Sequence, residues 1–438
     1  MRGVPARQPG RPASPRLLST RADAETKAIR LAWIRVESHT RDVAEAMTTA
    51  GAESRPGPPR NRHFLHLDSM RAVAVLGVLL IHVGASSVAN LTSWFGVATS
   101  QGRMGVRIFF LISAFLLYRP FVMAHLAETP SPGATTYAWR RVLRILPAYW
   151  VALTALAIWP GLNGVFTGDW WVYYGILQAF WGSTVFSGLV VAWSLTIEVT
   201  FYAALPFLAL FLGWLGRNAS PRTRMVRQLW ALAILGIASE IFRVYVFAIG
   251  QRTLNFSLPS MFLPFAVGMA LAVCSAWLGT EERKWRWTRF VADHSGVVWS
   301  AAIAIFVASC FTPFFGRTFV LRHTVWTWTF EQLAYVVIST LLLLPAVFGE
   351  TAGGWPRRIL GTRSLAFCGV ISYGIFLWHQ PLLAAMSQAG WGDWIPGSPF
   401  LALLIVTLPV SIAAGWASYR FVEAPAMRLR DQPPKRVT

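Results

Sequence analysis

Long apolar stretches, separated by short polar connections, dominate the chain after residue 65. A helix needs about 20 apolar residues to cross a hydrocarbon core about 30 Å thick. Ten runs of suitable length and composition lie at 70–88, 105–124, 145–160, 190–213, 228–249, 258–279, 296–315, 329–348, 365–388 and 399–421. The pattern predicts an all-α, polytopic membrane protein with about ten transmembrane helices.

The two ends of the chain lack such runs. Residues 1–64 are basic and rich in Arg, Pro and Ala, and they contain no apolar segment of signal-peptide type. We therefore expect a disordered tail over 1–64, a membrane domain over 65–428 and a short cytoplasmic tail over 429–438.

The placement of charge indicates how the chain crosses the membrane. The protein is 55% hydrophobic and 13% charged, with a formal net charge of +20. If the amino terminus is cytoplasmic, the cytoplasmic connections and tail after residue 64 carry 19 Lys and Arg, and the outer connections carry four. This bias predicts both termini in the cytoplasm of a multi-pass protein of the cell membrane. The basic charge then reflects topology and anionic lipids, and we expect no nucleic-acid partner.

The cysteines give no sign of a metal centre. Cys274, Cys310 and Cys368 each lie in an apolar run, and no Cys-x-x-Cys or Cys/His spacing occurs. Neither a disulfide framework nor a zinc site is predicted, and we expect no metal and no bound cofactor.

Ionisable groups close the first apolar run at both ends. In HLDSMRAVAVLGVLLIHVG, ten apolar residues separate Arg71 from His82. On a helix the two side chains share a face and lie about 16 Å apart along the axis. Ionisable groups at membrane depth are functional candidates, although an interfacial Arg anchor and a packed His would give the same pattern.

Two later runs carry ionisable groups at comparable depth. Glu198, in VVAWSLTIEVTFYAALPFL, lies about 12 Å from the outer end of its run, near the level of His82. His379, in ISYGIFLWHQPLL, lies in the outer half of the ninth run. One carboxylate and two imidazoles can converge on one cavity, where the carboxylate would make a histidine a general base. A structural polar cluster that joins helices is the alternative.

The connection before the third run is rich in arginine. In YAWRRVLRILPAYW, Arg141 and Arg144 are three positions apart and share a face if the segment is helical. Two guanidinium groups so placed suit a phosphate-bearing ligand, and Arg71 lies on the same side of the membrane. Ordinary positive-inside charge would leave the same residues here.

Other ionisable residues in the runs have a structural explanation. Glu240 and Arg243 are three positions apart, so they can neutralise each other, although contact with a substrate is the alternative. Glu331 lies near the outer end of the eighth run, and we expect it at the membrane interface.

Six segments, in order along the chain, resemble motifs of the integral-membrane acyltransferases of type 3, a family that includes the O-antigen acetylases. They are LDSMRAVAVLGVLLIHVG, GVRIFFLISAFLL, RRVLRILPAYW, AWSLTIEVTFYAALP, ISYGIFLWHQPLL and YRFVEAPAM, and the likeness covers residues 65–428. The chain departs from the family pattern at Ala114, Arg107 and Phe376, where Gly, Asp and Tyr are frequent.

The resemblance implies that an acyl group, commonly acetyl from acetyl-CoA, is transferred to a hydroxyl of a carbohydrate, a glycolipid or a glycosylated small molecule. Arg71, Arg141 and Arg144 would hold the phosphates of acyl-CoA, which is a co-substrate. His82 would act as base or take the acyl group transiently, and Glu198 would orient it or neutralise its charge. The side chains expected to contact the substrate are His379, Tyr373, Trp193 and Ser113.

The partners expected from the resemblance are acyl-CoA, the acceptor and membrane lipids. The protein would act alone or hand its acyl group to a separate extracytoplasmic protein. Two other classes stay open. A proton-coupled permease for a sugar or an acidic substrate would use the same buried Glu and His as a relay, and a lipid-handling scaffold would use neither chemically.

Overall fold

The computed structural model of the protein describes residues 65–431, apart from 90–92, 94, 281–284, 312–323 and 350–352. The described residues belong to one compact unit, Phe64–Thr438, and contain helices and turns but no β-strand. The all-α prediction is therefore confirmed. The disorder predicted for 1–64 falls outside the described residues and stays a prediction, as does the orientation of the termini.

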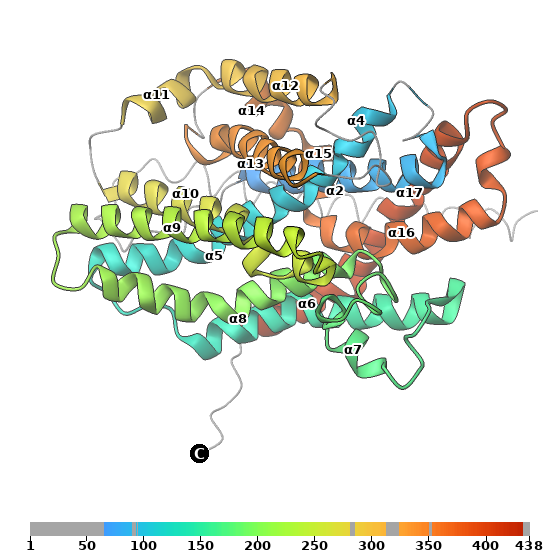
Figure 1. Cartoon of the computed structure of the whole chain (residues 1–438), viewed down its shortest axis with the longest axis horizontal. Helices are drawn as coiled ribbons and strands as arrows, with labels where there is room; N and C mark the ends of the chain where they lie inside the picture. Colours follow the sequence, from blue (N-terminus) through green and yellow to red (C-terminus); the bar gives the residue numbers. More distant parts are fainter. Residues whose placement is uncertain are drawn as a thin grey trace, which may run out of the picture. The chain divides into compact units, whose positions relative to one another are not determined.

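The long helices follow the ten predicted apolar runs in order (Figure 1). They are α2 (Leu65–Ser86), α5 (Met104–Ala127), α6 (Ala134–Leu156), α8 (Ala192–Leu215), α9 (Pro221–Ala248), α10 (Phe262–Thr280), α12 (Ser295–Phe311), α13 (Val325–Val347), α16 (Ser372–Gln388) and α17 (Pro399–Ser418). Short helices extend or connect them: α4 (Gly96–Ser100), α7 (Trp170–Tyr174), α11 (Arg286–Asp293), α14 (Trp355–Leu360), α15 (Arg363–Val370) and α18 (Ala424–Arg428).

The structure supports eight to ten membrane spans. In the described part of the chain, eight helices are long and apolar enough to cross a membrane, and the number is ten if each of two bent pairs counts as one span. The bent pairs are α11 with α12, at 86°, and α15 with α16, at 73°. The second bend divides the run 365–388, which the sequence predicts as continuous. The length of an apolar run indicates that it can span the membrane but does not indicate where the helix bends.

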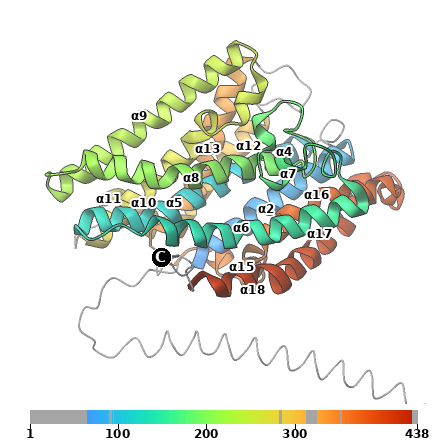
Figure 2. The ribbon, with the colours of Figure 1, turned by 90° about the horizontal axis from the view of Figure 1, so that it is seen from below.

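Helix α5 lies at the centre of the packing. In the most apolar stretch of the span Gly96–Ala127, which contains α5, 72% of the residues are buried, against 28% in the spans that contain α9 and α17. Helix α5 packs against α2, α8, α10 and α13. Figure 1 shows α8, α9 and α10 alongside one another, and Figure 2 shows α16 and α17 side by side.

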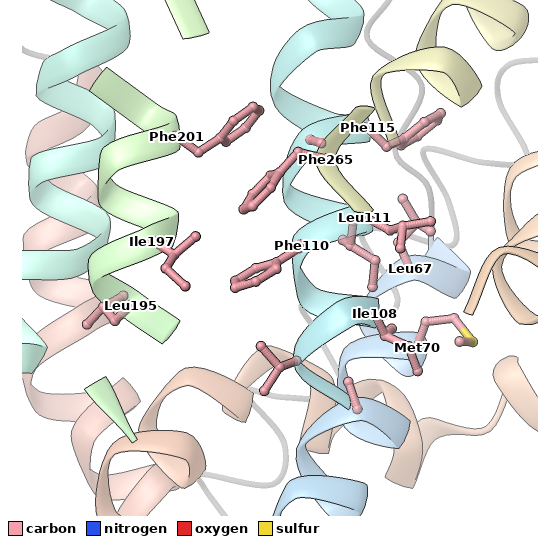
Figure 3. Close-up of a cluster of buried hydrophobic side chains, with 14 of the residues drawn as sticks. Leu67, Met70, Ile108, Phe110, Leu111, Phe115, Leu195, Ile197, Phe201 and Phe265 are labelled. Atoms are coloured by element: carbon pink, nitrogen blue, oxygen red, sulfur yellow. The ribbon is translucent and has the colours of Figure 1, made fainter. Parts of the chain in front are cut away.

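Aromatic rings tie three of these helices together (Figure 3). Phe110 of α5 stacks on Phe265 of α10 with ring centroids 4.5 Å apart, and Phe265 stacks on Phe201 of α8 at 4.2 Å. All three rings are buried. Within a membrane, helices are held by such close packing, since lipid tails are as apolar as the side chains themselves.

The carboxyl-terminal helices pack against α2, the first helix of the described residues. Both α15 and α16 pack against α2, and α16 also packs along α17. Gly374 of α16 meets Gly415 of α17 backbone to backbone, because a Cβ atom on Gly374 would lie 2.7 Å from the Cα and carbonyl oxygen of Gly415. This packing brings residues from the two ends of the described chain to one place.

Candidate functional site

A pocket opens where five helices meet, namely α2, α5, α6, α8 and α16. The pocket is partly open to solvent, and the space between atoms in it, with the open part included, is about 720 Å³. Its lining residues are Arg71, Val106, Phe109, Phe110, Ser113, Arg141, Arg144, Ile145, Ser194, Leu195, Glu198, Tyr202, Ser372, Tyr373 and Phe376. Of the nine candidate site residues, this lining contains Arg71, Ser113, Arg141, Arg144, Glu198 and Tyr373.

Two of the three arginines are held by carboxylates outside the lining. Arg71 lies 3.1 Å from Asp68, one turn earlier on α2. Arg144 lies 3.0 Å from Glu423, which is almost fully buried in a π-helical turn after α17. The Arg144 guanidinium also lies over the ring of Tyr373, 5.9 Å from its centroid. These contacts orient both guanidinium groups while leaving about a quarter of each side chain exposed.

Arg141 differs from its neighbours in having no carboxylate partner. It forms no ion pair with any residue that the structure describes, and its Nε is buried there without a hydrogen-bond partner. It lies three positions before Arg144 on α6, so both side chains project from one face into the pocket. The charge of Arg141 is therefore the least compensated in the site, and it is available to an anionic ligand.

Glu198 is the carboxylate of the pocket. It accepts hydrogen bonds from the hydroxyls of Ser113, on α5, and Tyr202, one turn later on α8. Within the described chain it makes no hydrogen bond to His82. Asp68 and Glu423 offset the charges of Arg71 and Arg144, so the attraction of the pocket for anions depends mainly on Arg141 and on the oriented guanidinium donors of the other two.

The two candidate histidines meet outside the pocket lining. His379 Nε2 lies 3.2 Å from His82 Nδ1, and the ring centroids are 5.0 Å apart. His379 is fully buried, whereas His82 is half-buried. The ring of Phe376, which does line the pocket, lies 6.1 Å from that of His379 and 6.2 Å from that of Phe109. Phe376 therefore lies next to both the pocket and the histidine pair.

Trp193 is the remaining candidate. It neighbours the pocket residue Ser194 in sequence but packs against Phe256, with ring centroids 5.1 Å apart, and does not line the pocket. Its contact with a substrate stays a prediction.

Three residues that contact the site side chains were not among the nine candidates. Asp68 and Tyr202 lie one helical turn from Arg71 and Glu198, so helical spacing alone could have suggested them. Glu423 lies 279 positions from Arg144, and only its place in the closing motif YRFVEAPAM pointed to it.

A second group of charged residues lies on α9 and α13, which do not line the pocket. Arg243 donates to Glu240 at 2.8 and 3.0 Å, so the predicted mutual neutralisation is confirmed. Glu331 is buried by its neighbours (3% exposed) and lies 2.8 Å from Arg103 and 2.7 Å from the Tyr335 hydroxyl, and its place at the membrane interface stays a prediction. Burial of a carboxylate is tolerated here because a cation and a hydroxyl both contact its Oε1.

Comparison with known proteins identifies the family of the helical domain. The family described as an acyltransferase domain matches residues 64–416. The peptidoglycan O-acetyltransferase OatA of Listeria monocytogenes is 25% identical over 383 residues, which cover 82% of this chain and 55% of that protein. A Staphylococcus aureus protein with the provisional name O-acetyltransferase is 22% identical over 380 residues, covering 83% and 57%.

A third relative matches over nearly its whole length. BcsY of Komagataeibacter xylinus, provisionally named a membrane-bound transacylase, is 25% identical over 393 residues, 86% of each chain. By contrast, the chain spans little more than half the length of the first two relatives. No solved structure matches. Together with the apolar helices, these matches show a multi-pass membrane protein.

Proposed function

The chain belongs to the family of proteins with this acyltransferase domain, and on that premise we propose that it is a membrane-embedded O-acyltransferase. The donor is an acyl-CoA, in the simplest case acetyl-CoA, and the acceptor is a hydroxyl of a carbohydrate, a glycolipid or a glycosylated small molecule. The observation that carries this proposal is the pocket, in which three arginines and one carboxylate converge.

The arginines suit the donor. CoA carries a diphosphate and a further ribose phosphate, and guanidinium groups bind phosphate oxygens through paired hydrogen bonds. Arg141, without a carboxylate partner, would bind the most directly. Arg71 and Arg144, already oriented by Asp68 and Glu423, would complete the phosphate site.

The reaction itself would take place near His82. Along α2 this residue lies about 16 Å from Arg71, a length that the pantetheine arm of CoA can span. His82 takes the proton of the acceptor hydroxyl while that oxygen bonds to the acyl carbon. The carbon–sulfur bond breaks, and the proton passes to the departing CoA thiolate. The thioester would approach His82 beside Phe376, which lines the pocket and whose ring lies 6.1 Å from that of His379.

The donor site is tested by Arg141→Gln, with the exposed neighbour Arg140→Gln as the matched control. A charge-assisted hydrogen bond contributes about 1.5–3 kcal/mol, so we expect acetyl-CoA to bind Arg141→Gln about ten- to a hundred-fold more weakly. Arg140→Gln removes the same charge outside the pocket and should bind like the wild type. Binding is measured on purified protein in nanodiscs.

Activity is then followed as release of free CoA thiol in the presence of hydroxyl acceptors, including peptidoglycan fragments and soluble oligosaccharides. Wild-type affinity in Arg141→Gln would place the donor elsewhere. Uptake of a sugar into sealed vesicles without consumption of acetyl-CoA would instead support the permease.

A further inference from the structure

The hydrogen bonds around His379 fix which of its ring nitrogens carries a proton. Its Nδ1 lies 3.0 Å from the carbonyl oxygen of Ile375 and 2.9 Å from that of Phe376. A carbonyl oxygen only accepts, so Nδ1 must carry the hydrogen. In the neutral ring Nε2 is then a bare acceptor, and this nitrogen faces His82.

The same reasoning assigns the tautomer of His82. Its Nδ1 lies 2.7 Å from the carbonyl oxygen of Val78, which again requires a hydrogen on Nδ1. That hydrogen is shared with His379 Nε2, at 3.2 Å. The opposite nitrogen of His82, Nε2, keeps its lone pair and has no hydrogen-bond partner among the described residues.

We infer that His379 is a positioning residue: it adds a second acceptor to the Val78 carbonyl at the His82 Nδ1–H, and so holds the ring with Nε2 free to take a proton from the acceptor hydroxyl. The backbone of α16 holds His379 in turn, and its complete burial prevents the ring from turning away. When His82 gains a proton on Nε2, its Nδ1–H bonds to His379 and Val78 become charge-assisted and strengthen. His379 thereby accepts the Nδ1–H hydrogen bond that a carboxylate accepts in a catalytic triad. Glu198 does not take this role, because it accepts from Ser113 and Tyr202 instead.

This inference rests on the proposed acyl transfer, and it is tested by exchanging His379 for two side chains of equal length. His379→Gln keeps an oxygen acceptor that can reach the His82 Nδ1–H, whereas His379→Met fills similar space without one. We expect kcat to fall about 100-fold or more in the Met variant, with both KM values within about twofold of the wild type. The Gln variant should keep at least about tenfold more activity than the Met variant.

The matched control is His294, which stacks on Phe290 at 4.8 Å and does not line the pocket. His294→Gln and His294→Met should both show wild-type kcat. Equal activity in the two His379 variants would overturn the inference, because packing alone does not distinguish an acceptor from a thioether. Retention of the wild-type melting temperature shows that each variant is folded.

A second readout does not depend on acyl transfer. Diethyl pyrocarbonate carbethoxylates an unprotonated imidazole nitrogen, and the labelling rate of His82 can be followed by peptide mass spectrometry. We expect labelling of His82 in the wild type and in His379→Gln. Labelling should be slower in His379→Met, where the ring keeps only its bond to Val78 and can turn its Nε2 away. Absence of labelling in the wild type, or equal rates in all three proteins, would overturn the assignment. This labelling pattern without any acyl transfer would refute the proposed function alone.

Discussion

Glu198 is the only carboxylate among the described residues that line the pocket, and it lies among three arginines. Glu198→Gln keeps the shape of the side chain and its ability to accept from Ser113 and Tyr202, but it removes the charge. We expect kcat to fall at least about tenfold, because the variant lacks the negative charge that would neutralise His82 when it takes the proton of the acceptor hydroxyl. The KM for the acyl donor should stay unchanged or fall, since the pocket becomes more positive.

Glu128→Gln provides the control for this change. Glu128 pairs with Arg224 at 2.6 Å, is 67% exposed and lies outside the pocket, so its neutralisation should leave both constants unaltered. A wild-type kcat in folded, membrane-inserted Glu198→Gln would reduce Glu198 to a packing role.

At the scale of elements, Arg357 of α14 joins three segments. Within the described chain its guanidinium donates to five carbonyl oxygens, those of Pro345, Phe348, Val291, Ala292 and Gly353. Four of these lie at the carboxyl ends of α13 and α11, where helix carbonyls lack partners and the helix dipole favours a cation. From the sequence, Arg357 counted only as positive-inside charge, because its acceptors lie in other helices.

Replacing Arg357 by Lys keeps the charge but cannot reproduce the planar fork of five donors. We expect the apparent melting temperature of the purified protein to fall by at least about 4 °C, because several buried carbonyls lose their donors. Arg358→Lys, one position along and exposed, should melt like the wild type. Thermal unfolding followed by intrinsic fluorescence measures both. If the two variants melted alike, the contacts of Arg357 would contribute nothing measurable to stability.

At the scale of the whole molecule, the orientation predicted from charge can be tested with single cysteines, after replacement of the three native ones by Ala. Cysteines at Ser220, before α9, and Thr362, before α15, should react with an impermeant maleimide only from the cytoplasmic side. Cysteines at Thr167, between α6 and α8, and Gly392, between α16 and α17, should react only from outside. A reversed site would overturn the ten-span orientation.

The sequence predicts the number and order of the long helices, since a bilayer demands the same apolar length of every span. The motifs also indicated nine candidate site residues, and six of these line one pocket. The convergence of the two histidines was expected, but the bend between α15 and α16, the Arg144–Glu423 pair and the bonding of Glu198 to Ser113 and Tyr202 rather than to a histidine were not predictable in this way. Each depends on at least one contact between residues that lie far apart in the sequence, and no periodic pattern records such contacts.

The meeting of Gly374 with Gly415 has a consequence for reading mutational scans. A methyl group at either position would separate α16 from α17, and α16 carries His379 only five residues after Gly374. A scan scored by lost activity would therefore rank these two glycines beside the histidines, although neither has a functional group to offer. At Gly374 and Gly415, a severe loss of activity would report how closely the backbones of α16 and α17 must approach for the rings of His379 and His82 to meet.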